Sequence, residues 1–148
     1  MDYKQEFKNF IQLLDKHEVP YLVIGGLAVA IYGYRRPTND IDVFVSSQEE
    51  HVNRLNNAIR DFGFGDSGKS VEDFQKNQLI IRLEIPPKTI DLVNHMDGLK
   101  FEEAWPEKTT SMVDGVRMNF IGKDHLIQNK KAAGRPRDLE DLAGLKAI

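Results

Sequence analysis

The only long uncharged stretch of the chain, Val19 to Tyr34, most constrains what the chain can fold into. It is too short to cross a membrane as a helix, and proline and glycine residues interrupt it, so we expect no membrane anchor. Its apolar segment Tyr21 to Ile24 predicts a buried strand that ends at Gly25-Gly26. The following segment, Leu27 to Tyr34, predicts a short apolar helix packed on a sheet.

Alternating helix and strand patterns continue through the rest of the chain. The apolar spacing in residues 3 to 16 predicts a helix, and Asp114-Gly115 predicts a hairpin. Ser47 with Glu50 predicts a capping box at a second helix, and Asp138 predicts a cap for the last one. Further strands are expected at Ile41 to Val45, Leu79 to Ile85, Thr89 to Val93 and 116–120, and further helices at 70–76 and Lys123 to Ala133, the latter ending at Gly134.

Length and composition fit one soluble domain. With 148 residues, we expect a single α/β (α+β) domain over residues 1–148, with a mixed sheet flanked by helices and with helices at the C-terminal end. The absence of cysteine excludes disulfides, thiol nucleophiles and cysteine-ligated zinc, and fits a cytoplasmic protein. A formal net charge of -3 does not by itself predict nucleic-acid binding, although it leaves room for a local basic patch.

Two acids in the strand that follows the glycine pair, Asp40 and Asp42, are the first candidate site. Side chains alternate along a strand, so both carboxylates face one side while Ile41 and Val43 face the core. Two such carboxylates repel each other unless a cation lies between them, and oxygen ligands suit Mg²⁺, or Mn²⁺ in its place. The simpler alternative is a solvated strand end.

Two further features strengthen the metal-site hypothesis. Gly25 and Gly26 lie where a strand turns into a helix, and glycine backbone and helical N–H groups can hold phosphate, although for the glycine pair alone a tight turn with nothing bound is the favoured interpretation. Asp91 is a lone carboxylate in an otherwise apolar strand, where an unpaired charge is costly. Glu84 is a rival third acid that solvent could satisfy, and we favour Asp91.

The order of these motifs resembles the nucleotidyltransferase superfamily of the DNA polymerase β type. The resemblance rests on Gly25-Gly26, on Asp40-Ile41-Asp42 with the segment before it, on Asp91, and on the stretch from Lys130 to Leu142. The sequence of these segments is similar to that of small prokaryotic members, including the AbiEii-like toxins. Many members have Gly-Ser where this chain has Gly25-Gly26, so a serine hydroxyl is missing, and Thr38 is a candidate replacement.

The resemblance implies a nucleotidyltransferase fold and transfer of a nucleoside monophosphate from an NTP. In that case Asp40, Asp42 and Asp91 would be the catalytic and metal-binding residues, holding Mg²⁺ or Mn²⁺, and pyrophosphate would leave. Gly25 and Gly26 would hold phosphate through backbone N–H groups. The acceptor would be a hydroxyl of RNA (tRNA is one candidate) or of a protein, and a toxin role would imply a cognate antitoxin.

Three basic residues have two interpretations each. Lys130 borders the buried side of its helix and either contacts phosphate or extends along the surface into water. Arg36 and Arg135 either clamp phosphate or pair with Asp138 and Asp141. His95 follows the strand of Asp91 and could lie near the site.

A second class of function competes with the enzyme. The same fold could keep affinity for NTP and metal without catalysis, and the missing serine favours this interpretation. A third possibility is a partner-binding antitoxin, which an exposed apolar patch would indicate. Retention of three mutually repelling acids favours the enzyme.

Overall fold

The computed structural model describes residues 3–36 and 40–146. Fifteen helices and strands of the described residues are α1 (Tyr3–Lys16), β1 (Tyr21–Ile24), α2 (Gly25–Ile31), β2 (Asp40–Val45), α3 (Glu49–Ile59), η1 (Arg60–Phe64), α4 (Val71–Lys76), β3 (Ile80–Ile85), β4 (Lys88–Val93), α5 (Phe101–Ala104), η2 (Trp105–Glu107), β5 (Thr109–Val113), β6 (Val116–Phe120), α6 (Lys123–Ala133) and α7 (Pro136–Lys146). None of these helices is long and apolar enough to span a bilayer.

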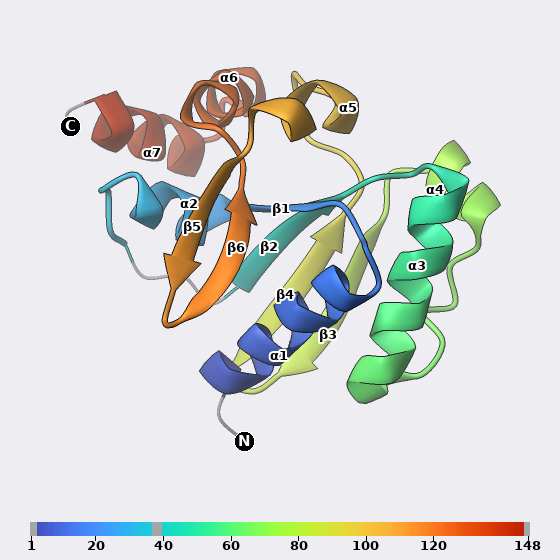
Figure 1. Ribbon diagram of the computed structural model, residues 1–148. Helices are drawn as coiled ribbons and strands as arrows, with labels where there is room; N and C mark the ends of the chain where they lie inside the picture. The colour runs from blue at the N-terminus through green and yellow to red at the C-terminus, as the bar shows by residue number, and fades with distance from the viewer. Residues whose placement is uncertain (1–2, 37–39, 147–148) are drawn as a thin grey trace.

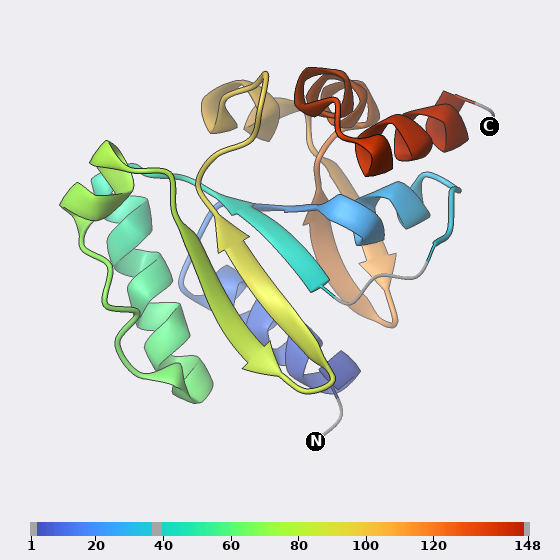
Figure 2. The ribbon, with the colours of Figure 1, turned by 180° about the vertical axis from the view of Figure 1, so that it is seen from behind.

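The strands form one mixed sheet in the order β3-β4-β2-β1-β6-β5. β2 pairs with β4 in parallel and with β1 antiparallel, so β2 lies in the interior of the sheet. Helices α1 and α3 cover one face, whereas α2, α6 and α7 gather beyond the other (Figure 1). Seen from behind, no helix of the described segments crosses in front of β3, β4 and β2 (Figure 2). The mixed sheet with flanking helices confirms the expected fold class.

The core lies between the sheet and α1 and α3. Phe10, Ile11 and Leu14 of α1 are fully buried, which confirms the helical spacing expected there. Along β3 the residues alternate between exposed and buried, with Ile81, Leu83 and Ile85 facing this core. The opposite face of β3 is therefore left to solvent.

Several expected boundaries differ from the structure. α2 begins at Gly25 and ends at Ile31, instead of running from Leu27 to Tyr34. The capping box expected at Ser47 is wrong, because the cap of α3 is Gln48 without a side-chain bond, and the Ser47 hydroxyl instead accepts a hydrogen bond from Asn94. A capping box does occur at Ser70, the residue before α4.

The end of α6 agrees with expectation, whereas the start of α7 does not. α6 ends at Ala133, and Gly134 after it has the left-handed conformation, with φ of 63°, as expected for a C-cap glycine. Asp138 lies inside the first turn of α7 instead of preceding the helix, but its carboxylate still accepts from the backbone N–H of Arg135 at 3.2 Å. The N-cap expected at Asp138 is therefore wrong: as the third residue of α7, Asp138 makes the reciprocal contact back to the residue before the helix.

The packing of α7 depends on a glycine. A Cβ atom on Gly144 would collide with the ring of Tyr34, which lies between α2 and β2 in the chain. The Tyr34 hydroxyl also donates to Glu140 at 3.4 Å. Gly144 thus allows α7 to lie directly on the segment that leads to the acid pair of β2.

We therefore predict that Gly144→Ala destabilises the protein. Alanine is favoured over glycine in a helix by about 1 kcal/mol, but overpacking costs about 1–3 kcal/mol, so the net change in unfolding free energy is a loss. Urea unfolding of Gly144→Ala measures it. The matched background is Tyr34→Ala, in which the same substitution becomes neutral or stabilising; a loss of equal size in both backgrounds would rule out the Tyr34 contact as its cause.

Candidate active site

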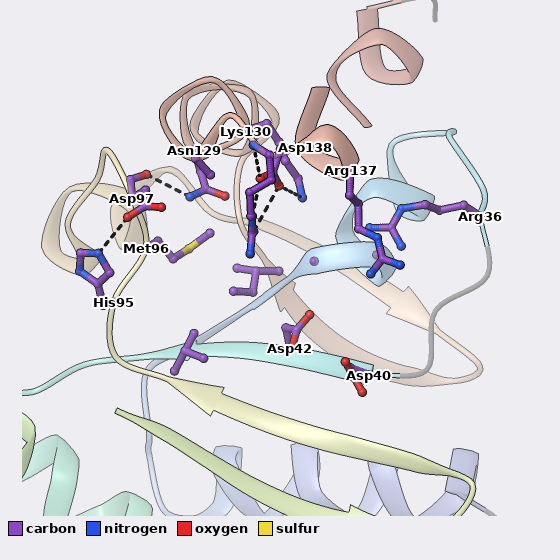
Figure 3. A pocket seen from close by; sticks show the side chains of 16 residues that line it. Arg36, Asp40, Asp42, His95, Met96, Asp97, Asn129, Lys130, Arg137 and Asp138 are labelled. Carbon is purple, nitrogen blue, oxygen red and sulfur yellow. Dashed lines mark hydrogen bonds and ion pairs between the residues drawn. The ribbon is translucent and has the colours of Figure 1, made fainter. Parts of the chain in front are cut away.

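Asp40 and Asp42 lie on the solvent-facing side of β2. Ile41, between the two acids, and Val43, after them, are buried, whereas both acids are only partly buried. The expected alternation along the strand is therefore confirmed. A cavity of about 420 Å³ lies against this side of the strand. Figure 3 shows the two carboxylates at the cavity's edge on β2, with side chains of α6 and α7 opposite them.

The sheet places Asp91 beside Asp42. In the parallel pair of β2 and β4, Asp42 and Asp91 are register partners, so their side chains face the same side. Asp91 is only 5% exposed, as expected for an acid in an apolar strand. Both of its oxygens, however, accept hydrogen bonds from Arg82 of β3, at 2.9 Å and 3.0 Å.

The three acids are therefore compensated unequally. Thr89 donates to Asp40 at 2.8 Å, and Arg82 pairs with Asp91. Burial, followed by the negative charges of Asp91 and Asp40, raises the pKa of Asp42 to about 6. A cation bound at Asp42 would relieve this unfavourable charge.

The donor set fits a hard divalent cation on Asp40 and Asp42. Both contribute carboxylate oxygens from one face of one strand, and burial together with the charges of Asp91 and Asp40 disfavours the negative charge of Asp42, which a bound cation would stabilise. Within residues 3–36 and 40–146, no group of three or more acidic or histidine side chains converges as a ligand set. The structure thus brings the three expected acids together on one face but directs Asp91 to Arg82.

The glycine turn lies against the acid pair. Gly25 and Gly26 both line the cavity. Gly25 has φ of +65°, and a Cβ atom there would collide with the carboxylate of Asp42. Glycine is therefore required at this position for both its backbone conformation and its proximity to Asp42.

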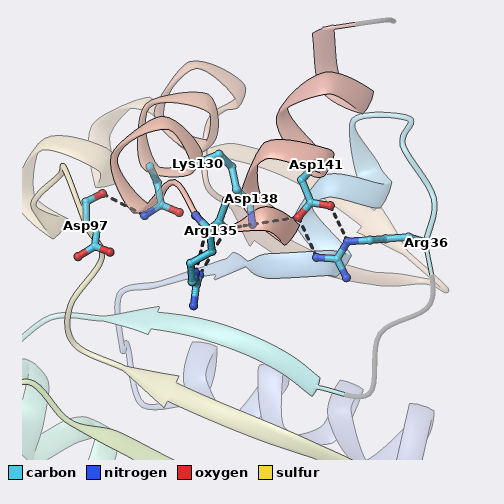
Figure 4. Close-up of polar contacts among 7 residues, drawn as sticks. Arg36, Asp97, Lys130, Arg135, Asp138 and Asp141 are labelled. Atoms are coloured by element: carbon cyan, nitrogen blue, oxygen red, sulfur yellow. Dashed lines mark hydrogen bonds and ion pairs between the residues drawn. The ribbon is translucent and has the colours of Figure 1, made fainter.

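The other side of the cavity carries a network of charged side chains, of which Lys130, Asp138 and Asp141 are buried (Figure 4). Lys130 of α6 is 5% exposed, and its ammonium group lies 3.2 Å from Asp138 and 3.1 Å from Asp141. Arg36 forms a two-bonded pair with Asp141 at 2.6 Å and 2.9 Å, and Arg135 pairs with Asp138 at 2.7 Å. We call these five residues the α6–α7 network.

Hydrogen bonds decide the charge state of the network's acids. Burial alone would raise the pKa of Asp141, but the bonds from Arg36 and Lys130 outweigh it and lower that pKa. The pKa of Asp138 is lowered in the same way by Arg135 and Lys130. Both acids are therefore ionised, and three cations face two anions.

These contacts bear on the alternatives for the basic residues. Lys130 does not extend into water, because its ammonium group is held between two buried carboxylates. Arg36 and Arg135 form the expected ion pairs with Asp141 and Asp138, and such a pair does not prevent a guanidinium from also contacting phosphate. All three also line the cavity, whereas Thr38 lies outside the described residues.

Three polar lining residues were not expected as site residues from the sequence. The side-chain amide of Asn129 donates a hydrogen bond of 3.0 Å to the backbone carbonyl of Asp97, which links the segment after β4 to α6. Arg137, in the first turn of α7, points into the cavity (Figure 3) and makes no hydrogen bond or ion pair with any described residue. Only its place in a basic stretch could have indicated it. His95, expected near the site, does line the cavity.

The raised pKa of Asp42 yields a stability prediction for metal-free protein. Below pH 3.8 the Asp42 carboxyl is mostly neutral in both the folded and the unfolded chain. As the pH rises from 3.8 through about 6, the unfolded chain ionises more readily than the folded one, so the free energy of unfolding falls. At pH 8, Asp42→Asn should be more stable than wild type by about 1 kcal/mol, since each pKa unit is worth about 1.4 kcal/mol and partial exposure reduces it.

Urea unfolding at pH 4 and pH 8, with EDTA present, measures this difference. The advantage of Asp42→Asn should shrink toward pH 4. Identical pH dependence of the two proteins would contradict a strained carboxylate at Asp42.

Several solved structures have a fold similar to that of this chain. The antibiotic-resistance factor ANT(2'')-Ia in complex with adenylyl-2''-tobramycin aligns with a TM-score of 0.61 at 14% identity, over 95% of this chain and 86% of that one. The lincosamide antibiotic adenylyltransferase LnuA, lincomycin-bound, aligns with a TM-score of 0.60 at 15% identity, over 97% and 96%. The Thermotoga maritima protein TM1012 aligns with a TM-score of 0.60 at 15% identity, over 98% and 92%.

At these identities the structural similarities show the fold, and they confirm the nucleotidyltransferase fold. No curated protein matches the chain in sequence. A family model described as a nucleotidyl transferase of unknown function matches residues 3–148, nearly the whole chain. The chain therefore belongs to this nucleotidyl transferase family.

Proposed function

We propose that this protein transfers a nucleoside monophosphate from an NTP to a hydroxyl group, with a divalent metal held by Asp40 and Asp42. The observation that carries the proposal is the opposition of charges across one cavity. The acid pair of β2 lies on one side, and basic side chains of the α6–α7 network lie on the other. A metal–triphosphate complex has the matching distribution of charge.

The reaction forms one bond and breaks one. The acceptor hydroxyl oxygen attacks the α-phosphorus, the bond from that phosphorus to the oxygen bridging to the β-phosphate breaks, and pyrophosphate leaves with the electron pair. Bound Mg²⁺, or Mn²⁺ in its place, would stabilise the charge on the attacking and leaving oxygens. The hydroxyl proton passes to a carboxylate or to water, and Asp91 is our candidate for helping this step.

The basic residues of the cavity supply the phosphate contacts in this proposal. Lys130, Arg36 and Arg135 give the network one positive charge more than its two acids neutralise. Arg137 is the cation whose guanidinium forms no pair within the described chain, so its donors are available to phosphate oxygens. Gly25 and Gly26 line the same cavity as these cations, and Gly25 lies against the Asp42 carboxylate, so we expect their backbone N–H groups to hold phosphate there.

The acceptor we propose is a hydroxyl of RNA, including tRNA, or of protein, in the cytoplasm. Growth inhibition on expression, relieved by a cognate antitoxin, would identify a toxin. Small molecules are the second acceptor class, because ANT(2'')-Ia and LnuA share the fold and are bound to an adenylylated aminoglycoside and to lincomycin.

Labelling with each α-³²P NTP, in Mg²⁺ or Mn²⁺, tests the function directly. Acceptor mixtures are cellular RNA, cellular protein, and aminoglycosides with lincosamides. We predict that Asp42→Ala lowers labelling by about 100-fold or more, because a metal-binding carboxylate is lost.

The matched control is Asp124→Ala, which removes an exposed acid in the first turn of α6. Its labelling should equal that of wild type. Wild-type activity in Asp42→Ala would refute the assignment of the site. Binding of NTP and metal by wild type, without transfer to any acceptor mixture, would instead support the non-catalytic binding module.

A further inference from the structure

Arg82 belongs to a row of side chains that runs across three strands toward the acid pair. It is the register partner of Asp91 in the antiparallel pair of β3 and β4, and Asp91 is the register partner of Asp42 in the pair of β4 and β2. Partners in register face the same side of a sheet. Arg82, Asp91 and Asp42 therefore lie side by side on the solvent-facing side.

The pair of Arg82 and Asp91 uses both oxygens of the carboxylate. The guanidinium donates from Nε to Oδ1 at 2.9 Å and from Nη2 to Oδ2 at 3.0 Å. This two-bonded geometry is the strongest form of a single arginine–carboxylate contact. While this ion pair is intact, both carboxylate oxygens of Asp91 accept hydrogen bonds from the Arg82 guanidinium.

The two partners differ sharply in exposure. The side chain of Asp91 is 8% exposed, whereas that of Arg82 is 55% exposed. The arginine lies on the edge strand of the sheet and can move into water without unfolding any element. Asp91 cannot move away in the same manner, and an unpaired charge at its position is costly. A cation must remain next to Asp91, but it need not be Arg82.

We propose that Arg82 competes with the divalent metal for Asp91. This inference rests on the function proposed above. Metal occupies Asp40 and Asp42 first, and Asp91 becomes available to the site only when Arg82 withdraws into solvent. Arg82 is thus a positioning residue that weakens metal binding in the resting protein and keeps Asp91 compensated when no metal is present.

This exchange accounts for two observations together. The three acids lie on one face, yet no group of three acidic or histidine side chains converges as a ligand set in the described part of the chain. An arginine that has captured both oxygens of the third acid explains why. It also explains how a buried carboxylate remains tolerable next to Asp42.

Binding of Mn²⁺ to the whole protein, measured by electron paramagnetic resonance of the free ion, tests the proposal. We predict that Arg82→Ala binds Mn²⁺ about tenfold more tightly than wild type, a change equivalent to about 1.4 kcal/mol. Arg82→Lys, which keeps the charge but loses the paired donors, should fall between the two. Arg60→Ala removes an exposed arginine of η1 and should bind as wild type does.

The Asp91→Asn background separates competition from simple charge repulsion. If Arg82 acts through Asp91, adding Arg82→Ala to Asp91→Asn leaves Mn²⁺ affinity unchanged. A tenfold gain that persists in that background would overturn the proposal, because Arg82 would then act on the metal at a distance. Equal or weaker binding in folded Arg82→Ala would also overturn it.

Two further controls keep the outcomes distinct. Circular dichroism checks the fold of each variant, and Arg82→Gln replaces Arg82→Ala if the alanine variant does not fold. Mn²⁺ binding by wild type must be lost in Asp42→Asn. If wild type shows no such binding, the proposed metal site fails and this inference fails with it, whereas Asp42-dependent binding that ignores Arg82 overturns this inference alone.

Discussion

Burial of Asp42 beside two further carboxylates on two adjacent strands is the constraint on which this site depends. Strand register places Asp42 beside Asp91, and strand alternation places Asp40 on the same face. Asp40 and Asp91 have partners in Thr89 and Arg82, whereas the pKa of Asp42 is raised to about 6. The fold therefore holds an excess of negative charge at one point, which a cation relieves.

Opposite charge is concentrated on the other side of the same cavity. The α6–α7 network buries Lys130 between Asp138 and Asp141, so α6 and α7 are joined by ion pairs in addition to their packing. Arg36 extends the network to the segment that leads into β2. A buried pair of this kind is weak evidence for stability, but removing one partner is strongly destabilising. We infer that its role is to fix the position of cations opposite the acid pair.

The acid pair and most elements could be predicted because they depend on local patterns. Alternation along β2, the apolar spacing of α1, and the glycine after α6 each act within a few residues. The capping box expected at Ser47 is wrong: α3 is capped at Gln48, and the Ser47 hydroxyl accepts a hydrogen bond from Asn94, a residue distant in sequence. Local pattern cannot reveal such a contact.

The same limit explains what the sequence missed at the site. Asp91 could be identified as a lone acid in an apolar strand, but its partner could not, because that depends on the register between β3 and β4. Lys130 could be placed at the border of a buried face, while its position between two acids follows from how α7 folds back on α6. Arg137 has no ion-pair partner among the described residues, and no local sequence pattern indicates this.

Anomalous X-ray diffraction from crystals grown with Mn²⁺ and a non-hydrolysable NTP analogue tests the central claim most directly. The account predicts an Mn²⁺ peak about 2.2 Å from carboxylate oxygens of both Asp40 and Asp42, with the triphosphate between this ion and the cations of α6 and α7. An Mn²⁺ ion bound elsewhere, or a triphosphate lying outside this cavity, would contradict it.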